Sequence, residues 1–171
     1  MAPDPSLRRR REEIVREHMD SENRHEFDAT LDTFGHPRYE LIGTGEVYDG
    51  AEQVGRYYED TRRAFPDQRN ELLALHHADD AVLVEAIVRG THRGPLRNLP
   101  PTGREFELPI LAVFAFQGES LVCERVYFDQ TTVLRQLGIA RDPLSLTGRL
   151  QTLVGHPLTI ARGLVRQFTG R

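Results

Sequence analysis

AVLVEAIVRGTH, residues 81–92, has only apolar residues at its even-numbered positions from 82 to 88, whereas the charged Glu85 and Arg89 are odd-numbered. A period of two is typical of a β-strand that buries one face. Three further segments show this period, and short turn-like segments separate them: QRNELLALHH (68–77), EFELPILAVFAF (105–116) and SLVCERVYFD (120–129). The second half of the domain is therefore predicted to form four strands of a mostly antiparallel sheet.

The first half of the chain has the 3.6-residue period of amphipathic helices. We expect helices over 5–18, 22–34 and 50–65, with a short strand, RYELIG, over 38–43. Helices followed by a run of strands indicate the α+β class, with the helices on one face of a curved sheet. Two further short amphipathic helices are predicted in the basic segment after Ile139.

The composition excludes several classes of function. The net charge is −4 with both signs interspersed, which gives no reason to expect a nucleic-acid partner. All 22 cationic residues are Arg, so neither Schiff-base catalysis nor a P-loop lysine is available. The single Cys123 cannot form an internal disulfide, and the first residues contain no apolar signal segment. We expect a cytoplasmic protein.

Four motifs in order resemble the SnoaL-like ester cyclase branch of the nuclear transport factor two-like superfamily. They are AFPD (64–67), RGTHRGPL (89–96), PPTGR (100–104) and YFDQTTVLRQLG (127–138). The resemblance covers about residues 10–139. It implies a cone: a strongly bent, mixed but mostly antiparallel sheet wrapped around three N-terminal helices, with an apolar pocket between them. We therefore expect a cone domain over 1–139 and a C-terminal amphipathic helical extension over 140–171.

Proteins of this family include polyketide cyclases, ketosteroid isomerases, limonene epoxide hydrolases and proteins that only bind a ligand. Where the cyclases and epoxide hydrolases carry an acid on the last strand, this sequence has Val126. The Arg and Asp of the epoxide hydrolases fall on Ala86 and Val88. The isomerase base falls on Ile42, or on Glu40 if the register of that strand slips by two residues. The resemblance thus leaves the catalytic group open.

Strand parity suggests other candidates. Glu124 shares a face with Val126 and Phe128, and His92 follows the inward face of residues 84–90, so both are predicted to face the pocket. The predicted catalytic residues are Glu124, His92 and Glu40, and the predicted substrate-binding residues are Tyr39, Ala86, Val88, Ala112, Val126 and Phe128. Such a lining suits a polyketide, a terpenoid or a steroid-like molecule.

Each candidate also has a structural interpretation. Asp129 is better placed to cap the helix that follows it than to move a proton. Glu124 could pair with an arginine at the rim of the sheet, and His92 could bond a loop carbonyl. The adjacent His76 and His77 point to opposite faces of a strand, so we predict no metal site there. The resemblance implies no cofactor.

Two functions remain. We favour a cofactor-independent enzyme of the SnoaL type that cyclises, isomerises or hydrates a hydrophobic small molecule by acid–base catalysis. The alternative is a binding protein that has lost the family's acid. A homodimer through the convex face of the sheet is expected from the resemblance. The basic tail, 144–171, is expected to pack on its own domain or on a dimer partner, with contact to a membrane surface as the alternative.

Overall fold

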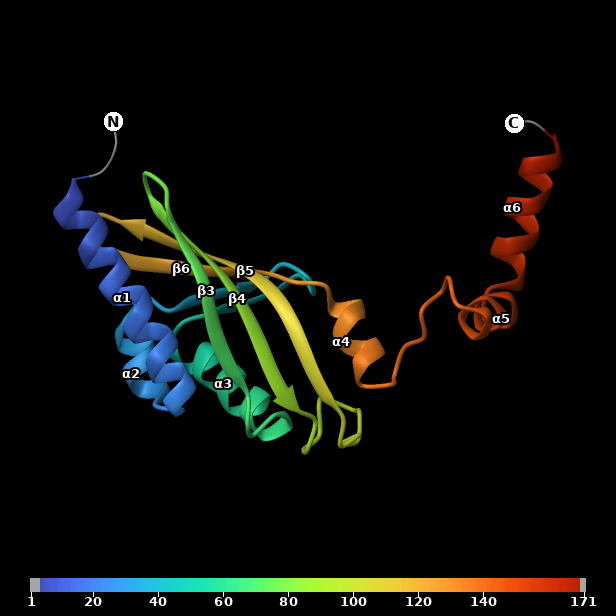
Figure 1. Ribbon diagram of the computed structural model, residues 1–171, viewed down its shortest axis with the longest axis horizontal. Coiled ribbons are helices and arrows are strands. Elements are labelled where there is room, and N and C mark those ends of the chain that lie inside the picture. Colours follow the sequence, from blue (N-terminus) through green and yellow to red (C-terminus); the bar gives the residue numbers. More distant parts are fainter. Residues whose placement is uncertain (1–3, 170–171) are drawn as a thin grey trace.

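The computed structural model describes residues 4–169 and has the predicted α+β architecture. Six strands form one curved sheet, helices cover one of its faces, and two helices follow at the C-terminus (Figure 1). The helices are α1 Pro5–Arg24, α2 Phe27–Asp32, α3 Ala51–Ala64, α4 Gln130–Gln136, α5 Leu146–Gly155 and α6 Pro157–Thr169. The strands are β1 Arg38–Leu41, β2 Glu46–Asp49, β3 Arg69–His77, β4 Ala81–Thr91, β5 Glu105–Gln117 and β6 Ser120–Tyr127.

The strand order in the sheet is β2-β1-β6-β5-β4-β3. Every neighbouring pair is antiparallel except β1 and β6, which run parallel, so the sheet is mixed as expected. The parallel pair brings Tyr39 of β1 beside Glu124 of β6. Residues that are 85 positions apart in the chain therefore become neighbours on the sheet.

The core lies between the inner face of the sheet and the first three helices. Val15 and Met19 of α1 and Val54 and Tyr58 of α3 are buried against the strands. The even-numbered residues of β4 and β5 face this core, because the side chains of a strand alternate between its faces. The buried face is the one that the period of the sequence predicts.

The N-terminal helices differ from the prediction in their boundaries. Helix α1 continues to Arg24 rather than ending near His18, and α2 is only six residues long. His25 separates them: its φ is 61°, in the left-handed region, and its backbone N–H donates to the carbonyl of Glu22. This is a common way for a helix to end, although Gly or Asn usually occupies the position. The composition around His25 therefore gave little sign of the break.

Strand β2 was not predicted. It forms a hairpin with β1, and Gly45, with φ 74°, lies in the turn between them. Strand β2 buries no row of apolar residues: Val47 and Asp49 are exposed, and Glu46 and Tyr48 are half-buried, so no alternation of apolar and polar residues marked it in the sequence.

Asp129 caps a helix, as its position before α4 predicts. Its carboxylate accepts hydrogen bonds from the backbone N–H of Thr131 at 2.8 Å and from the hydroxyl of Thr132 at 2.6 Å. These hydrogen bonds favour the charged carboxylate, so the pKa of Asp129 is lowered.

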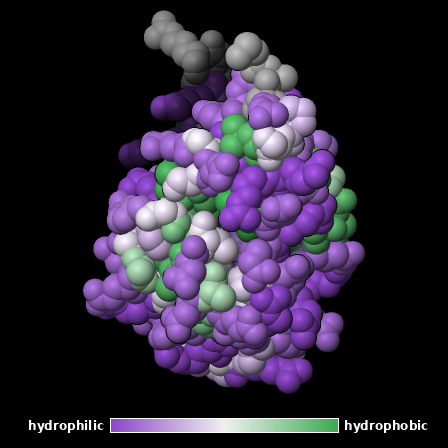
Figure 2. All heavy atoms as spheres, turned by 90° about the vertical axis from the view of Figure 1, so that its left-hand side faces the viewer, coloured by the Kyte–Doolittle hydropathy of each residue, from purple (hydrophilic) through white to green (hydrophobic). Residues whose placement is uncertain are grey.

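The arginine run Arg8–Arg11 is part of α1 and contains one buried member. Arg11 donates to the carbonyl oxygens of Asp79 and Gly118, each at 2.9 Å, and lies over the ring of Phe116. It thus joins α1 to the β3–β4 and β5–β6 turns. Arg9 and Arg10 are exposed, and this end of the molecule is mainly hydrophilic, with apolar side chains in small separate areas (Figure 2).

Arg11→Lys is expected to lower the free energy of unfolding by about 1–3 kcal/mol. Lysine keeps the charge but cannot reach two carbonyl oxygens with a planar fork, so one buried acceptor is left without a donor. Urea unfolding would measure the change, and Arg10→Lys is the matched control because Arg10 is exposed. Equal stability of the two variants would show that the Arg11 contacts do not join these elements.

The C-terminal tail forms two helices, as predicted, but they do not pack on the body of their own chain. In Figure 1, α5 and α6 extend away from the sheet beyond α4. Their apolar side chains are largely exposed, for example Leu146 and Phe168. Packing of the tail on its own domain is therefore wrong for this structure. Among residues 4–169 no helix is both long and apolar enough to cross a membrane.

Candidate active site

A large cavity lies between the inner face of the sheet and the helices. Its volume is about 1130 Å³ and it is open on one side. Buried strand residues such as Val84, Leu108 and Phe114 form its deep wall, whereas exposed side chains such as Arg56, Arg63 and Arg97 lie at its mouth. A mostly apolar cavity of this size can enclose a multi-ring small molecule.

The six predicted substrate-binding positions all line this cavity. Val126 points inward and is buried, so the position where the relatives carry an acid is apolar here. Tyr39 lines the cavity as a buried residue, because β1 pairs with the centre of β6. The full set of predicted positions on the cavity wall is Tyr39, Ala86, Val88, Ala112, Val126 and Phe128.

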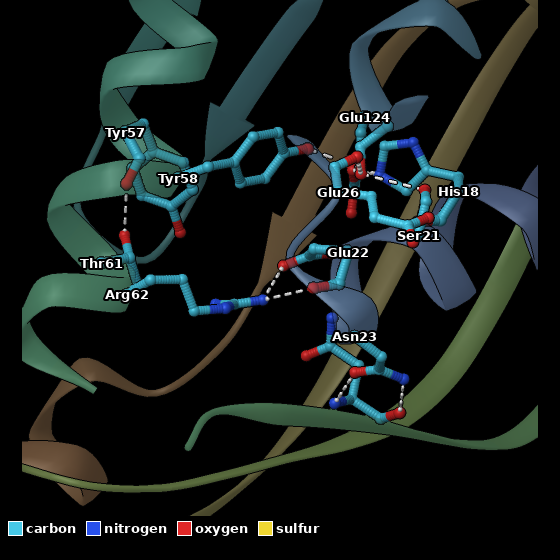
Figure 3. A network of polar contacts seen from close by, with 12 residues as sticks. His18, Ser21, Glu22, Asn23, Glu26, Tyr57, Tyr58, Thr61, Arg62 and Glu124 are labelled. Atoms are coloured by element: carbon cyan, nitrogen blue, oxygen red, sulfur yellow. Dashed lines mark hydrogen bonds and ion pairs between the residues drawn. The ribbon is translucent and has the colours of Figure 1, made fainter. Parts of the chain in front are cut away.

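Glu124 is the acidic side chain buried in the deep wall of the cavity, and it faces a histidine that was not predicted. Nε2 of His18, in α1, lies 3.0 Å from Oε2 of Glu124, and both side chains are almost wholly buried (Figure 3). The distance is that of an ion pair, but the contact lacks the alignment of a hydrogen bond, so Oε2 has no hydrogen-bond donor. The partner of this carboxylate at the cavity wall is therefore a titratable group rather than a permanent cation.

Hydrogen bonds on the far side of the ring hold His18 in place. Nδ1 lies 2.8 Å from the hydroxyl oxygen of Thr33, whose own proton is donated to the carbonyl of Thr30 at 2.6 Å. The Thr33 oxygen therefore accepts the Nδ1 proton, and Nε2 presents a proton or a lone pair toward Glu124. Aromatic rings of Phe34 and Phe114 contact the imidazole edge-on. An oriented imidazole beside a carboxylate is a common arrangement for proton transfer.

The two members of the pair have perturbed pKa values. Burial raises the pKa of Glu124, and the neighbouring His18 opposes this increase without cancelling it. Burial alone would lower the pKa of His18, but the Glu124 carboxylate raises it above its usual 6.5. Desolvation together with a specific charged partner, at the wall of a cavity, is characteristic of functional groups.

Tyrosines surround the pair and remain neutral. Burial, with a smaller effect of the Glu124 charge, raises the pKa of Tyr39 and Tyr58 well above the usual range. The Tyr58 hydroxyl lies 3.5 Å from Nε2 of His18, and Tyr39 of β1 is the neighbour of Glu124 across the parallel pair of strands. Neutral phenols can donate hydrogen bonds to an oxygen that becomes negative.

A second buried ion pair lies beside the first. Arg62 of α3 donates to the Glu22 carboxylate at 3.0 Å and to the Glu22 carbonyl at 3.2 Å (Figure 3). Its guanidinium lies over the ring of Phe27. Glu22 also lines the cavity. The positive charge of Arg62 balances the negative charge of Glu22, and the pair joins α1 to α3. Of these two buried acids at the cavity wall, Glu124 is the one whose partner, His18, is a titratable group.

His92 does not line the cavity. It is fully buried beneath the loop that joins β4 to β5, where its Nδ1 accepts the backbone N–H of Thr102 at 3.2 Å and its ring packs against Phe65. Burial lowers its pKa. Its side chain has the predicted inward parity, but the loop after β4 folds over it. The expected position in the pocket is therefore wrong.

Glu40 also lies outside the cavity. Its inward neighbours in β1 are Tyr39 and Leu41, so Glu40 points to the outer face of the sheet. There it pairs with Arg38 at 2.8 Å and with Arg125 at 3.2 Å. The short strand β1 does not slip to bring an acid inward, and a catalytic role for Glu40 has no geometric support.

No cluster of three or more His, Cys, Asp or Glu side chains that could hold a metal ion occurs within residues 4–169. His76 instead pairs with Glu85 across β3 and β4, with Nε2 and Oε1 2.9 Å apart on the exposed face. This pair has the same chemistry as His18–Glu124 but is open to solvent, which makes it a natural control.

The curved sheet, the three helices inside it and the cavity between them define the cone fold of the nuclear transport factor two-like proteins. The sequence matches the family described as SnoaL-like polyketide cyclase over residues 12–137. The chain belongs to this family. Helices α5 and α6 follow the matched region.

Solved structures with the same fold share little sequence with this chain. A Jannaschia protein provisionally described as a SnoaL-like polyketide cyclase is 19% identical, with a TM-score of 0.72, over 82% of this chain and 99% of that one. TsrD from Streptomyces laurentii is 20% identical, with a TM-score of 0.67, over 81% and 99%. IdmH from Streptomyces antibioticus, provisionally a polyketide cyclase, is 23% identical, with a TM-score of 0.64, over 75% and 98%. Comparison with curated proteins gives no match.

Proposed function

We propose that the protein is a cofactor-independent enzyme that cyclises, isomerises or hydrates a hydrophobic small molecule of the polyketide, terpenoid or steroid-like kind. The observation that carries the proposal is Glu124 in the deep wall of an otherwise mostly apolar cavity, with Nε2 of the buried His18 3.0 Å from its carboxylate. Burying an ionisable pair is costly, so a pair kept at a ligand-accessible wall suggests a chemical role.

The proposed chemistry is a proton transfer. Glu124 removes a proton from a carbon next to a carbonyl group of the substrate, and the electron pair moves to the carbonyl oxygen to form an enolate. Tyr39, neutral and beside Glu124, donates a hydrogen bond to that oxygen. The enolate carbon then attacks a second carbonyl of the same molecule, which closes a ring, and the alkoxide that forms takes the proton back from Glu124. Alternatively, the enolate takes the proton back from Glu124 at another carbon, which isomerises the substrate. For hydration, Glu124 would instead remove a proton from water.

His18 acts as a positioning residue in this scheme. Its ring is oriented by Thr33 and faces the carboxylate, so it stabilises the charged form of Glu124 before reaction. The apolar wall binds the substrate, through the predicted positions Ala86, Val88, Ala112, Val126 and Phe128.

A second candidate function is ligand binding without turnover. Val126 favours it, because this buried position carries a catalytic acid in the cyclases and epoxide hydrolases that the chain resembles. The two functions differ in what Glu124 does: a binding protein needs the pair only for its fold, whereas an enzyme needs its carboxylate to accept a proton.

The experiment is a turnover assay of wild type, Glu124→Gln and Glu85→Gln against a panel of polyketide, terpenoid and steroid-like ketones. Turnover by wild type and Glu85→Gln with loss in Glu124→Gln would support the enzyme. Tight binding of a panel member without turnover by wild type would favour the binding protein. The homodimer and the cytoplasmic location expected from the sequence remain parts of the proposal.

A further inference from the structure

The tail has a different charge balance from the rest of the chain. Residues 140–171 hold five of the 22 arginines but only one of the 26 acidic residues, Asp142. From Pro143 to Thr169 there are three arginines, Arg149, Arg162 and Arg166, and no acid. The body, by contrast, carries more acids than arginines. The tail is therefore basic, whereas the body of the protein is acidic.

The arginines and the apolar residues lie on separate faces of α6. At about 100° per residue, Arg162 and Arg166 fall on the side opposite Leu164 and Phe168. The apolar face of α6 comprises Leu158, Ile160, Ala161, Leu164, Val165 and Phe168, and that of α5 comprises Leu146, Leu150, Leu153 and Val154. Phe168 is 84% exposed and Leu146 is 85% exposed. Both helices are thus amphipathic, and their apolar faces are open.

We propose that α5 and α6 dock on an anionic lipid surface. The interface of such a membrane offers an apolar layer for Leu, Val and Phe side chains and, in the same plane, negative headgroups for the arginines. Each helix is only about 15–20 Å long, so the two bind together rather than singly. The acidic body of a second copy would attract the arginines, but the end of the body seen in Figure 2 presents no wide apolar patch to receive the opposite face.

The position of the tail has a consequence for the cavity. Val133 and Leu134 of α4 and Ile139, which immediately precedes the tail, all line the cavity. A tail bound to a bilayer would therefore hold this side of the cavity near the membrane, where apolar molecules concentrate. This consequence rests on the proposed function, but lipid binding by the tail does not.

The test is co-sedimentation of the full chain with vesicles of phosphatidylcholine alone or of phosphatidylcholine mixed with phosphatidylglycerol. We expect binding to the mixed vesicles, at least about tenfold weaker binding to the neutral ones, and release from the mixed vesicles at high salt. Equal binding to both vesicle types, or to neither, would overturn the proposal.

Variants separate the charged face from the apolar face. The double variant Arg162→Gln/Arg166→Gln is expected to weaken binding to mixed vesicles by about tenfold or more, whereas Arg9→Gln/Arg10→Gln, on the exposed side of α1, should leave it unchanged. Leu164→Ser should weaken binding as well, and Thr159→Ser, on the polar face, is its control. Loss of binding in the α1 variant but not in the tail variant would also overturn the proposal.

A second copy of the chain is the competing occupant. Sedimentation velocity without vesicles, on wild type and Leu164→Ser, measures it directly. A dimer that Leu164→Ser dissociates, together with no binding to mixed vesicles, would show that the tail binds another copy and would refute lipid docking. If Arg162→Gln/Arg166→Gln turns over a water-dispersed ketone at the wild-type rate, lipid binding by the tail is not required for catalysis in the cavity.

Discussion

Glu124→Gln is expected to lower kcat by about 10²- to 10⁴-fold on any substrate that wild type turns over. Glutamine has nearly the same shape as glutamate, but its amide cannot accept a proton, which removes general base catalysis. KM should change little, because the apolar wall rather than the carboxylate provides most of the binding. The measurement is steady-state kinetics on the panel member that wild type converts fastest.

The control for Glu124→Gln is Glu85→Gln. Glu85 also pairs with a histidine at 2.9 Å, but on the exposed outer face of the sheet, so its replacement should leave kcat unchanged. A Glu124→Gln variant that keeps the wild-type kcat would remove Glu124 from the mechanism. A fall in kcat that is equal in both variants would point to a general effect of lost charge.

His18→Leu is expected to lower the free energy of unfolding by about 3–5 kcal/mol at neutral pH. Removing one member of a buried ion pair leaves the other charge without a partner in an apolar wall. Glu124 can escape part of this cost by taking up a proton; at pH 7 that uptake alone costs about 3 kcal/mol for a group that ordinarily titrates near pH 4.5. Denaturant unfolding measures the change.

The double variant His18→Leu/Glu124→Leu separates the pair from the packing around it. Two apolar residues in place of a buried ion pair are often neutral or stabilising, so the double variant should recover most of the stability lost in His18→Leu. His76→Leu breaks the exposed pair and should have little effect. If the double variant is less stable than His18→Leu, the unpaired charge is not the cause of the loss.

The fold was largely predictable because long strands show a clear alternation of apolar and polar residues. Strand β5 has 13 residues and β4 has 11, so a period of two repeats often enough to identify both the strand and its buried face. The strand β2 lacks an apolar face and the helix break at His25 lacks a Gly or Asn, so neither was predicted. Whether the tail packs on the body depends on contacts between distant surfaces, which local periodicity does not report.

The candidate site was predicted in part. The inward parity of Glu124 and Val126 on one strand was correct, because parity follows directly from the pleat. His92 has the inward parity too, but a loop covers it, and parity says nothing about loops. His18 was visible as a polar residue on the apolar side of the first helix. Only the packing of α1 against the inner face of the sheet shows that it meets Glu124, since 106 positions separate them in the chain.

The central claim is that His18 and Glu124 form a coupled ionisable pair, and an NMR titration of the His18 ring tests it most directly. In wild type, the Glu124 carboxylate should hold the pKa of His18 above 6.5. In Glu124→Gln the carboxylate is gone and burial alone remains, so His18 should titrate below 6.5 or stay neutral across the accessible range. A His18 pKa at or below 6.5 in wild type, or one that Glu124→Gln leaves unchanged, would contradict the account.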